Sequence, residues 1–195
     1  MTLTAAILTG GLATRFGGRD KSTLLVGGRS ILERQIDELS RLTSDILLVG
    51  GSARHERARV VGDTVPGCGP LGGLHAALTE ARGDATLVIA CDMPYVTSPL
   101  LAYLAALTCE AEAVVPQTER GYHPLCAAYT RACLEPVARR LFDGRLKMTD
   151  LLADLRVRVV MPEELDRFGD RHQLLANVNS PAEYSGLETL KGHQL

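Results

Sequence analysis

The sequence contains no long hydrophobic run, and its first residues do not predict a secretory signal. Its longest uninterrupted apolar stretch, residues 100–107, has eight residues, far below the roughly 20 that a membrane-spanning helix needs. No basic residue precedes Arg15, and no small-residue cleavage pattern follows the first apolar stretch, so a secretory signal is not predicted. We therefore expect a cytoplasmic protein that has no membrane partner.

The chain also carries almost no net charge and no paired cysteines. Lys and Arg total 21 against 23 Asp and Glu, for a net charge of −2, which leaves no global basic surface for nucleic acid or an anionic membrane. Any anion site must be local. The cysteines at 68, 91, 109, 126 and 133 are odd in number and no pair has metal-site spacing, which argues against a disulfide framework and a cysteine zinc site.

What remains is the composition of one ordinary globular domain spanning residues 1–195, with 46% apolar and 23% charged residues. Strand patterns occur at 3–8, 46–49, 60–61, 86–90, 113–115, 125–128 and 157–161. Helical patterns occur at 31–42, 74–81, 99–107, 131–142 and 148–154, with another from 181, and Ser98 is the expected N-cap of the helix 99–107. Ser30 and Glu33 form a capping box for the first helix. Because strands alternate with helices, we predict an α/β fold with a mainly parallel sheet flanked by helices.

The segment LTGGLATRFGGRDK, residues 8–21, has the composition of a phosphate-binding loop. It follows the first strand, contains two glycine pairs, and carries Arg15, Arg19 and Lys21 against a single acid. Glycines let main-chain N–H groups approach an anion, and the cations neutralise phosphate charge. Neither a Walker A motif nor a GxGxxG fingerprint is present. The alternative is an ordinary glycine-rich surface loop.

The segment CDMP, residues 91–94, places an acid at the end of the apolar strand 86–90. Ligands of open α/β sheets bind outside the carboxyl ends of the strands, so Asp92 is predicted to face the same crevice as the first loop. One carboxylate together with phosphate oxygens is a usual Mg²⁺ environment at nucleotides. The alternative is that Asp92 caps the following turn.

Several other polar residues have simpler interpretations. His75 and His123 are expected to be packed or loop histidines. The basic cluster of Arg139, Arg140, Arg145 and Lys147 is expected to form a solvated face, with binding of an acidic phosphate as the alternative.

Five motifs, taken in order and spacing, resemble those of the molybdenum cofactor guanylyltransferases, the MobA family. They are LTGGLATRFGGRDK at 8–21, GPLGGLHAAL at 69–78, CDMP at 91–94, HPL at 123–125 and NVNSPAEY at 177–184. The first motif resembles the opening of sugar-phosphate nucleotidyltransferases as well, whereas GPLGG, HPL and NVNSP together make the resemblance specific. The resemblance implies a single Rossmann-like nucleotidyltransferase domain that transfers GMP from Mg²⁺-bound GTP to molybdopterin and releases pyrophosphate.

The resemblance also implies roles for individual residues. Lys21, Arg15 and Asp92 are the expected catalytic residues, and Asp92 is the expected Mg²⁺ ligand. The expected GTP contacts lie in motifs 8–21, 63–78 and 91–94: Leu8, Thr9, Gly10, Gly11, Lys21, Asp63, Gly72, Gly73 and Asp92. Gly72 and Gly73 are expected in a loop on the nucleotide side. Asn177 and Asn179, in the segment 123–184, are expected to face the pterin.

Alternatives to this function remain open at the level of sequence. One is a molybdopterin cytidylyltransferase, because the residue types do not determine which nucleotide base the protein selects. Another is a sugar-phosphate nucleotidyltransferase, and a third is a noncatalytic nucleotide-binding module. The expected partners are GTP and molybdopterin, with transient contacts to other proteins of cofactor biosynthesis and none to nucleic acid.

Overall fold

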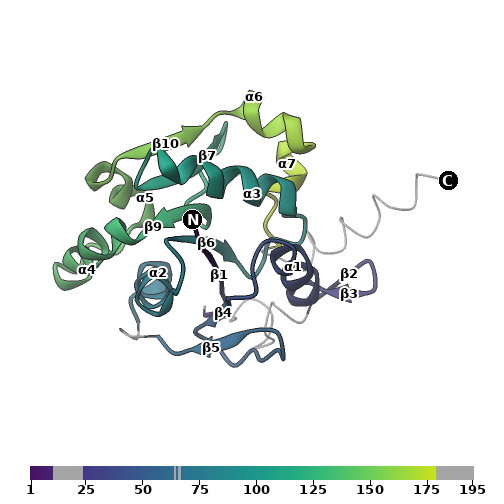
Figure 1. Ribbon diagram of the computed structural model, residues 1–195, viewed down its shortest axis with the longest axis horizontal. Coiled ribbons are helices and arrows are strands. Elements are labelled where there is room, and N and C mark those ends of the chain that lie inside the picture. Colours follow the sequence, from purple (N-terminus) through teal and green to yellow (C-terminus); the bar gives the residue numbers. More distant parts are fainter. Residues whose placement is uncertain (11–23, 64, 66, 179–195) are drawn as a thin grey trace.

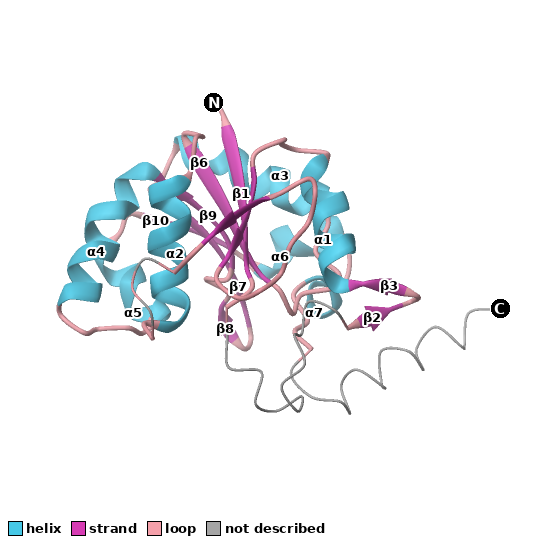
Figure 2. Ribbon diagram, turned by 90° about the horizontal axis from the view of Figure 1, so that it is seen from below, coloured by secondary structure: helices cyan, strands magenta, loops and turns pink. Residues whose placement is uncertain are grey.

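A mostly parallel sheet lies between two layers of helices in the computed structural model, which describes residues 1–10, 24–63, 65 and 67–178 (Figures 1 and 2). The sheet order is β10-β7-β9-β6-β1-β4-β5, and β8 pairs with β7 outside this path. The strands are β1 (Leu3–Leu8), β4 (Ile46–Val49), β5 (Arg59–Val61), β6 (Ala85–Ala90), β7 (Ala113–Thr118), β8 (Gly121–Tyr122), β9 (Cys126–Thr130) and β10 (Val157–Val160). A separate hairpin joins β2 (Leu25–Val26) and β3 (Arg29–Ser30).

Most neighbouring strands run in the same direction, as predicted. β1 pairs in parallel with β4 and β6, β4 with β5, and β7 with β10. β9 is antiparallel to both β6 and β7, and the short β8 is antiparallel to β7. The prediction of an α/β fold with a mainly parallel sheet is therefore confirmed.

Helices cover both faces of the sheet, and each face has its own hydrophobic core. On one face lie α1 (Ile31–Ser40), α3 (Ser98–Ala106), α6 (Pro162–Leu165) and α7 (Arg171–Leu174), and on the other α2 (Gly69–Glu80), α4 (Leu134–Phe142) and α5 (Met148–Leu151), as Figure 2 shows. Alternate residues of β1 point to opposite faces, with Ala5 and Ile7 in the first core and Ala6 and Leu8 in the second. Burial on both faces explains why these strands read as continuous apolar runs.

The capping box at the start of α1 is confirmed. Glu33 N–H donates to Ser30 Oγ over 3.2 Å, and Ser30 N–H donates to Glu33 Oε2 over 3.1 Å. The predicted helix 131–142 divides into a 3-10 turn, Arg131–Cys133, followed by α4. The short elements β2, β3, β8, α6 and α7 were not predicted from the sequence. The predicted helix from 181 lies outside the described residues.

The predicted start of α2 at Leu74 is wrong, because the helix begins at Gly69. Pro70 in the first turn needs no N–H partner there, and its ring favours helical backbone. A methyl group added at Gly72 would lie 3.1 Å from the Val65 carbonyl oxygen, and one at Gly73 would lie 3.3 Å from Leu8 Cδ2. The glycines therefore serve close packing inside a helix, although glycine by itself disfavours helix. No helix in the described part of the chain is long and apolar enough to span a membrane.

Candidate active site

The carboxyl ends of four parallel strands meet at one edge of the sheet. Leu8 of β1 is paired in register with Val49 of β4 and with Ala90 of β6, and Val49 is paired with Val61 of β5. The loops that follow these four residues therefore leave the sheet at the same level. In open α/β sheets this edge is where ligands bind.

The glycines that follow β4 pack closely against the main chain at the end of β1. Gly50 and Gly51 follow β4 with φ angles of +71° and +61°, which favour glycine. A methyl group at Gly50 would lie 3.1 Å from Gly10 Cα, and one at Gly51 would lie 2.8 Å from the Thr9 carbonyl oxygen. Only glycine permits this approach. Sequence analysis missed this second pair, although its position directly after a strand repeats the signal that identified Gly10 and Gly11.

The Thr9 hydroxyl is engaged within this packing. Thr9 is buried, and its Oγ1 donates toward the carbonyl oxygens of Val49, at 3.1 Å, and Gly50, at 2.5 Å. The main-chain N–H groups of Thr9 and Gly10 both donate to the Val49 carbonyl, at 2.9 and 3.2 Å. Thr9 therefore joins the end of β1 to the end of β4.

The Asp63 carboxylate lies beside Gly10 and Gly50. A methyl group at Gly10 would lie 3.7 Å from Asp63 Oδ2, and one at Gly50 would lie 3.3 Å from Oδ1. Asp63 is exposed two residues after the end of β5. The structure thus brings Asp63 and Gly10, both predicted from sequence as nucleotide contacts, to the same place.

Asp92 lies in a tight turn directly after β6 and is half-buried. Cys91 N–H donates to the Leu8 carbonyl over 3.2 Å, and Met93 N–H donates to the Ala90 carbonyl over 3.3 Å. Val178 N–H donates to the Asp92 carbonyl over 2.8 Å. These contacts connect the turn to β1 and to the segment that contains Asn177.

A pocket of about 410 Å³ adjoins this turn and gathers residues from four of the five motifs. Pro70 of α2, Met93 of the Asp92 turn, His123 before β9 and Asn177 all line it, together with Lys147. Residues from the motifs at 69–78, 91–94 and 123–125, together with Asn177, therefore surround one cavity.

Among the described residues that line the pocket, His123 and Cys126 carry groups that could act as a base or a nucleophile. His123 Nε2 lies 2.8 Å from Thr118 Oγ1. Burial, assisted by the charge of Arg120, lowers the pKa of His123, so the imidazole is neutral at pH 7. Burial raises the pKa of the Cys126 thiol to about 12, so the nucleophilic thiolate does not form near neutral pH. Neither group is therefore in its charged form near neutral pH.

The predicted basic face is partly wrong. Arg140 is only 2% exposed, and it donates from Nε to Asp154 Oδ2 and from Nη2 to the Asp150 carbonyl, each over 2.5 Å. Arg140 thereby holds α4 against the segment that begins with α5. Lys147, by contrast, is largely exposed, pairs with Asp150 at 3.1 Å and lines the pocket.

The remaining predicted site residues have two outcomes. Gly72 and Gly73 are buried within α2, so the expectation that they form a loop is wrong for the packing reason given above. Gly11, Arg15, Lys21 and Asn179 lie outside the described residues.

The carboxylate of Asp92 suits a hard cation that is also bound by the phosphate oxygens of a nucleotide. No three His, Cys, Asp or Glu side chains form a metal cluster within residues 1–10, 24–63, 65 and 67–178. Mg²⁺ at a nucleotide is typically bound by one or two carboxylates and by phosphate oxygens. Asp92, half-buried at the sheet edge, is a hard oxygen donor of this kind.

Comparison with known proteins identifies the family. The family model of the MobA-like NTP transferase domain matches residues 5–159. A probable molybdenum cofactor guanylyltransferase of Pelotomaculum thermopropionicum is 32% identical over 92% of this chain and 89% of its own. A molybdenum cofactor guanylyltransferase of Desulfosudis oleivorans is 29% identical over 95% and 94% of the two chains.

Solved structures share the fold. Molybdopterin-guanine dinucleotide biosynthesis protein A from Archaeoglobus fulgidus superposes with a TM-score of 0.81 at 24% identity, covering 97% of this chain and 98% of its own. The 2-C-methyl-D-erythritol 4-phosphate cytidylyltransferase from Thermus thermophilus gives a TM-score of 0.72 at 18% identity, covering 98% and 100%.

The fold and the sheet-edge site define a Rossmann-like nucleotidyltransferase. The family match covers most of the described chain, and the relatives align along nearly its whole length. The chain belongs to the family of proteins with a MobA-like NTP transferase domain.

Proposed function

We propose that this chain transfers GMP from Mg²⁺-bound GTP to molybdopterin, releasing pyrophosphate and forming molybdopterin guanine dinucleotide. The observation that carries the proposal is the two-sided arrangement around the Asp92 turn. Gly10 and Asp63 lie along the same sheet edge, and Met93, next to Asp92, lines the 410 Å³ pocket. Several relatives that align with nearly the full length of this chain are named for this activity.

The nucleotide side of the site consists of the loops after β1, β5 and β6. Leu8, Thr9 and Gly10 contact the triphosphate through their main chain. The Thr9 side chain takes no part in this contact, because its hydroxyl already donates to carbonyl oxygens of the protein. We assign further GTP contacts to Gly11, Lys21, Asp63 and Asp92, and phosphate-loop shaping to Arg15. Gly72 and Gly73 support these loops by allowing α2 to pack against Val65 and Leu8.

The reaction is an in-line displacement at the α-phosphate. A terminal phosphate oxygen of molybdopterin forms the new bond to the α-phosphorus, and the bond to the bridging oxygen breaks as pyrophosphate leaves. A phosphate monoester is ionised at pH 7, so the nucleophile needs no strong general base. When bound at Asp92, Mg²⁺ neutralises triphosphate charge. Lys21, Arg15 and main-chain N–H groups position the phosphates and stabilise the developing charge.

The pocket beside Met93 suits the acceptor. Its walls combine apolar residues such as Pro70 and Leu125 with polar groups on His123, Lys147 and Asn177, a mixture typical of small-molecule sites. We assign molybdopterin to this pocket, with Asn177 and Asn179 on the pterin side. We place the reaction in the cytoplasm, with transient contacts to other proteins of cofactor biosynthesis.

The test is a competition assay with purified protein, Mg²⁺ and molybdopterin. GTP, CTP, ATP and UTP are supplied at equal concentration, and dinucleotide products and pyrophosphate are measured. The expected product is the guanine dinucleotide. Preference for CTP would replace the guanylyl assignment with a cytidylyl one. Binding of GTP without dinucleotide formation, with either bare or molybdate-loaded molybdopterin, would favour a noncatalytic nucleotide-binding module.

A further inference from the structure

Gln35 is a polar side chain buried in an otherwise apolar helix face. Gln35 lies on α1 and is only 1% exposed. Its helix neighbours Leu32, Ile36 and Leu39 belong to the hydrophobic core on this face of the sheet. Its Nε2 donates to the Ala90 carbonyl over 2.7 Å and to the Met93 carbonyl over 3.0 Å. Both partners are carbonyl oxygens, so the amide nitrogen must face them and the orientation of the side chain is determined.

The two carbonyls that Gln35 contacts lie on either side of Cys91 and Asp92. Ala90 ends β6, and its carbonyl also accepts the Met93 N–H that closes the turn. Gln35 therefore binds the turn at both ends from the α1 side. The contact is independent of the Asp92 carboxylate itself.

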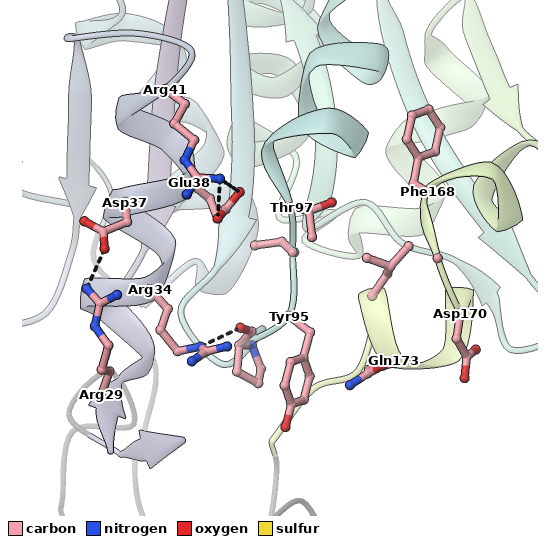
Figure 3. A pocket seen from close by; sticks show the side chains of 14 residues that line it. Arg29, Arg34, Asp37, Glu38, Arg41, Tyr95, Thr97, Phe168, Asp170 and Gln173 are labelled. Atoms are coloured by element: carbon pink, nitrogen blue, oxygen red, sulfur yellow. Dashed lines mark hydrogen bonds and ion pairs between the residues drawn. The ribbon is translucent and has the colours of Figure 1, made fainter. Parts of the chain in front are cut away.

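The neighbouring residue on α1 extends this attachment. Arg34, labelled in Figure 3 beside Tyr95, donates from Nε to the Pro94 carbonyl over 3.3 Å and from Nη1 to the Val26 carbonyl over 3.3 Å. Its guanidinium lies 5.9 Å from the centre of the Tyr95 ring. Together Arg34 and Gln35 hold the carbonyls of residues 90, 93 and 94 to one helix.

We propose that Gln35 is a positioning residue that sets the geometry of the Asp92 turn and thereby of the metal and nucleotide. This inference rests on the proposed role of Asp92. Within the described part of the chain, Gln35 Oε1 is buried without a hydrogen-bond partner. An unpaired buried acceptor is unfavourable, and an apolar side chain would avoid it. What a glutamine provides here and an apolar side chain would not is the pair of hydrogen bonds to the Ala90 and Met93 carbonyls.

The main test replaces Gln35 with methionine, which has similar length but no donor. Groups that orient a metal ligand typically contribute roughly 10- to 100-fold to metal affinity or activity. We expect Gln35→Met to raise the Mg²⁺ concentration for half-maximal dinucleotide formation by at least about tenfold. We also expect faster hydrogen exchange at the Met93 and Val178 amides, whose acceptors belong to this turn.

Ile36→Val is the matched control, because Ile36 is the next residue on α1 and is fully buried but has no polar group. It should weaken the core without changing the metal requirement or the exchange of those two amides. Unchanged exchange in Gln35→Met would overturn the proposal. Faster exchange with a metal requirement equal to that of Ile36→Val would also overturn it.

A second variant covers the case in which Gln35→Met does not fold. Gln35→Glu keeps the shape, and burial keeps its carboxyl protonated to higher pH, so that it donates one hydrogen bond. We expect partial function that declines as pH rises, relative to wild type; a constant ratio would contradict the proposal. If the wild-type protein forms no dinucleotide, the proposed function fails. The role of Gln35 is then still tested by amide exchange and by the affinity for Mn²⁺, used in place of Mg²⁺, in the presence of GTP.

Discussion

The main-chain N–H of Val178 donates a 2.8 Å hydrogen bond to the main-chain carbonyl of Asp92. The two residues belong to the motifs at 177–184 and 91–94, which are far apart in the sequence. The contact brings Asn177 to the pocket that Met93 also lines. The segment proposed to bind the nucleotide and the segment proposed to face the acceptor are therefore connected by a main-chain hydrogen bond at a single turn.

Asp92→Ala is expected to reduce turnover by orders of magnitude and to leave the fold intact. Removing one hard-ion ligand impairs charge neutralisation, and the half-buried position opens no cavity in the core. Pyrophosphate release measures turnover, and thermal unfolding checks the fold. Asp84→Ala is the control, because Asp84 accepts the Thr2 N–H at the opposite end of β6. Wild-type turnover in Asp92→Ala, or in wild type with EDTA, would refute the metal role.

Lys21→Ala is expected to weaken GTP binding and the chemical step by about 1–3 kcal/mol, the usual range for a charged hydrogen bond. Lys21→Arg should restore function only in part, because guanidinium and ammonium groups bind phosphate differently. Calorimetric titration of GTP measures the affinities. The control is Arg139→Ala, an exposed cation paired with Glu135, expected to change GTP affinity by less than about 0.5 kcal/mol. Equal dissociation constants for wild type and both Lys21 variants would remove Lys21 from the site.

Gly51→Ala is expected to destabilise the protein more than Gly28→Ala does. Both glycines have left-handed backbone, with φ of +61° and +80°, which costs a non-glycine residue about 1–2 kcal/mol. Only at Gly51 would the new methyl group meet main chain, 2.8 Å from the Thr9 carbonyl oxygen, whereas Gly28 has open space. Urea unfolding measures both losses. Equal losses of stability in the two variants would show that Gly51 does not pack against the Thr9 main chain as closely as described.

Glu164→Gln is expected to reduce stability near pH 7 but not at low pH. A hydrogen bond from Arg158, at 2.6 Å, lowers the pKa of Glu164 to about 2, with help from Tyr103 and the Met161 N–H and against the effect of burial. The depressed pKa favours the folded state above the unfolded pKa, and this stability is lost as pH falls from about 4.5 toward 2.

The loss in Glu164→Gln at pH 7 should be on the order of 2–3 kcal/mol and should shrink as the pH is lowered through that range. Glu163→Gln, at the exposed neighbouring position, is the control and should stay within about 0.5 kcal/mol of wild type. Denaturant unfolding at several pH values makes the comparison. A loss in Glu164→Gln that does not vary with pH would contradict the assigned pKa.

Local sequence patterns predicted the elements that depend on local interactions. The buried runs of β1 and β6 are apolar because both faces of each strand are covered, and this is visible as continuous hydrophobicity. The Ser30–Glu33 capping box involves residues three apart. The position of Asp92 after a buried strand was likewise predictable, since the carboxyl ends of parallel strands gather at one edge.

The sequence by itself therefore determined the α/β class, the order of the motifs and the residue types available for phosphate and metal. Only the tertiary structure decided that Gly72 and Gly73 are helical, that Arg140 is buried, and that Gln35 bonds to the Asp92 turn. Gly73 and Gln35 contact segments far apart in the chain, and Arg140 bonds to residues 10 and 14 positions further along. Such contacts override local propensity because burial and hydrogen bonding contribute more free energy than the difference between helix and loop preferences.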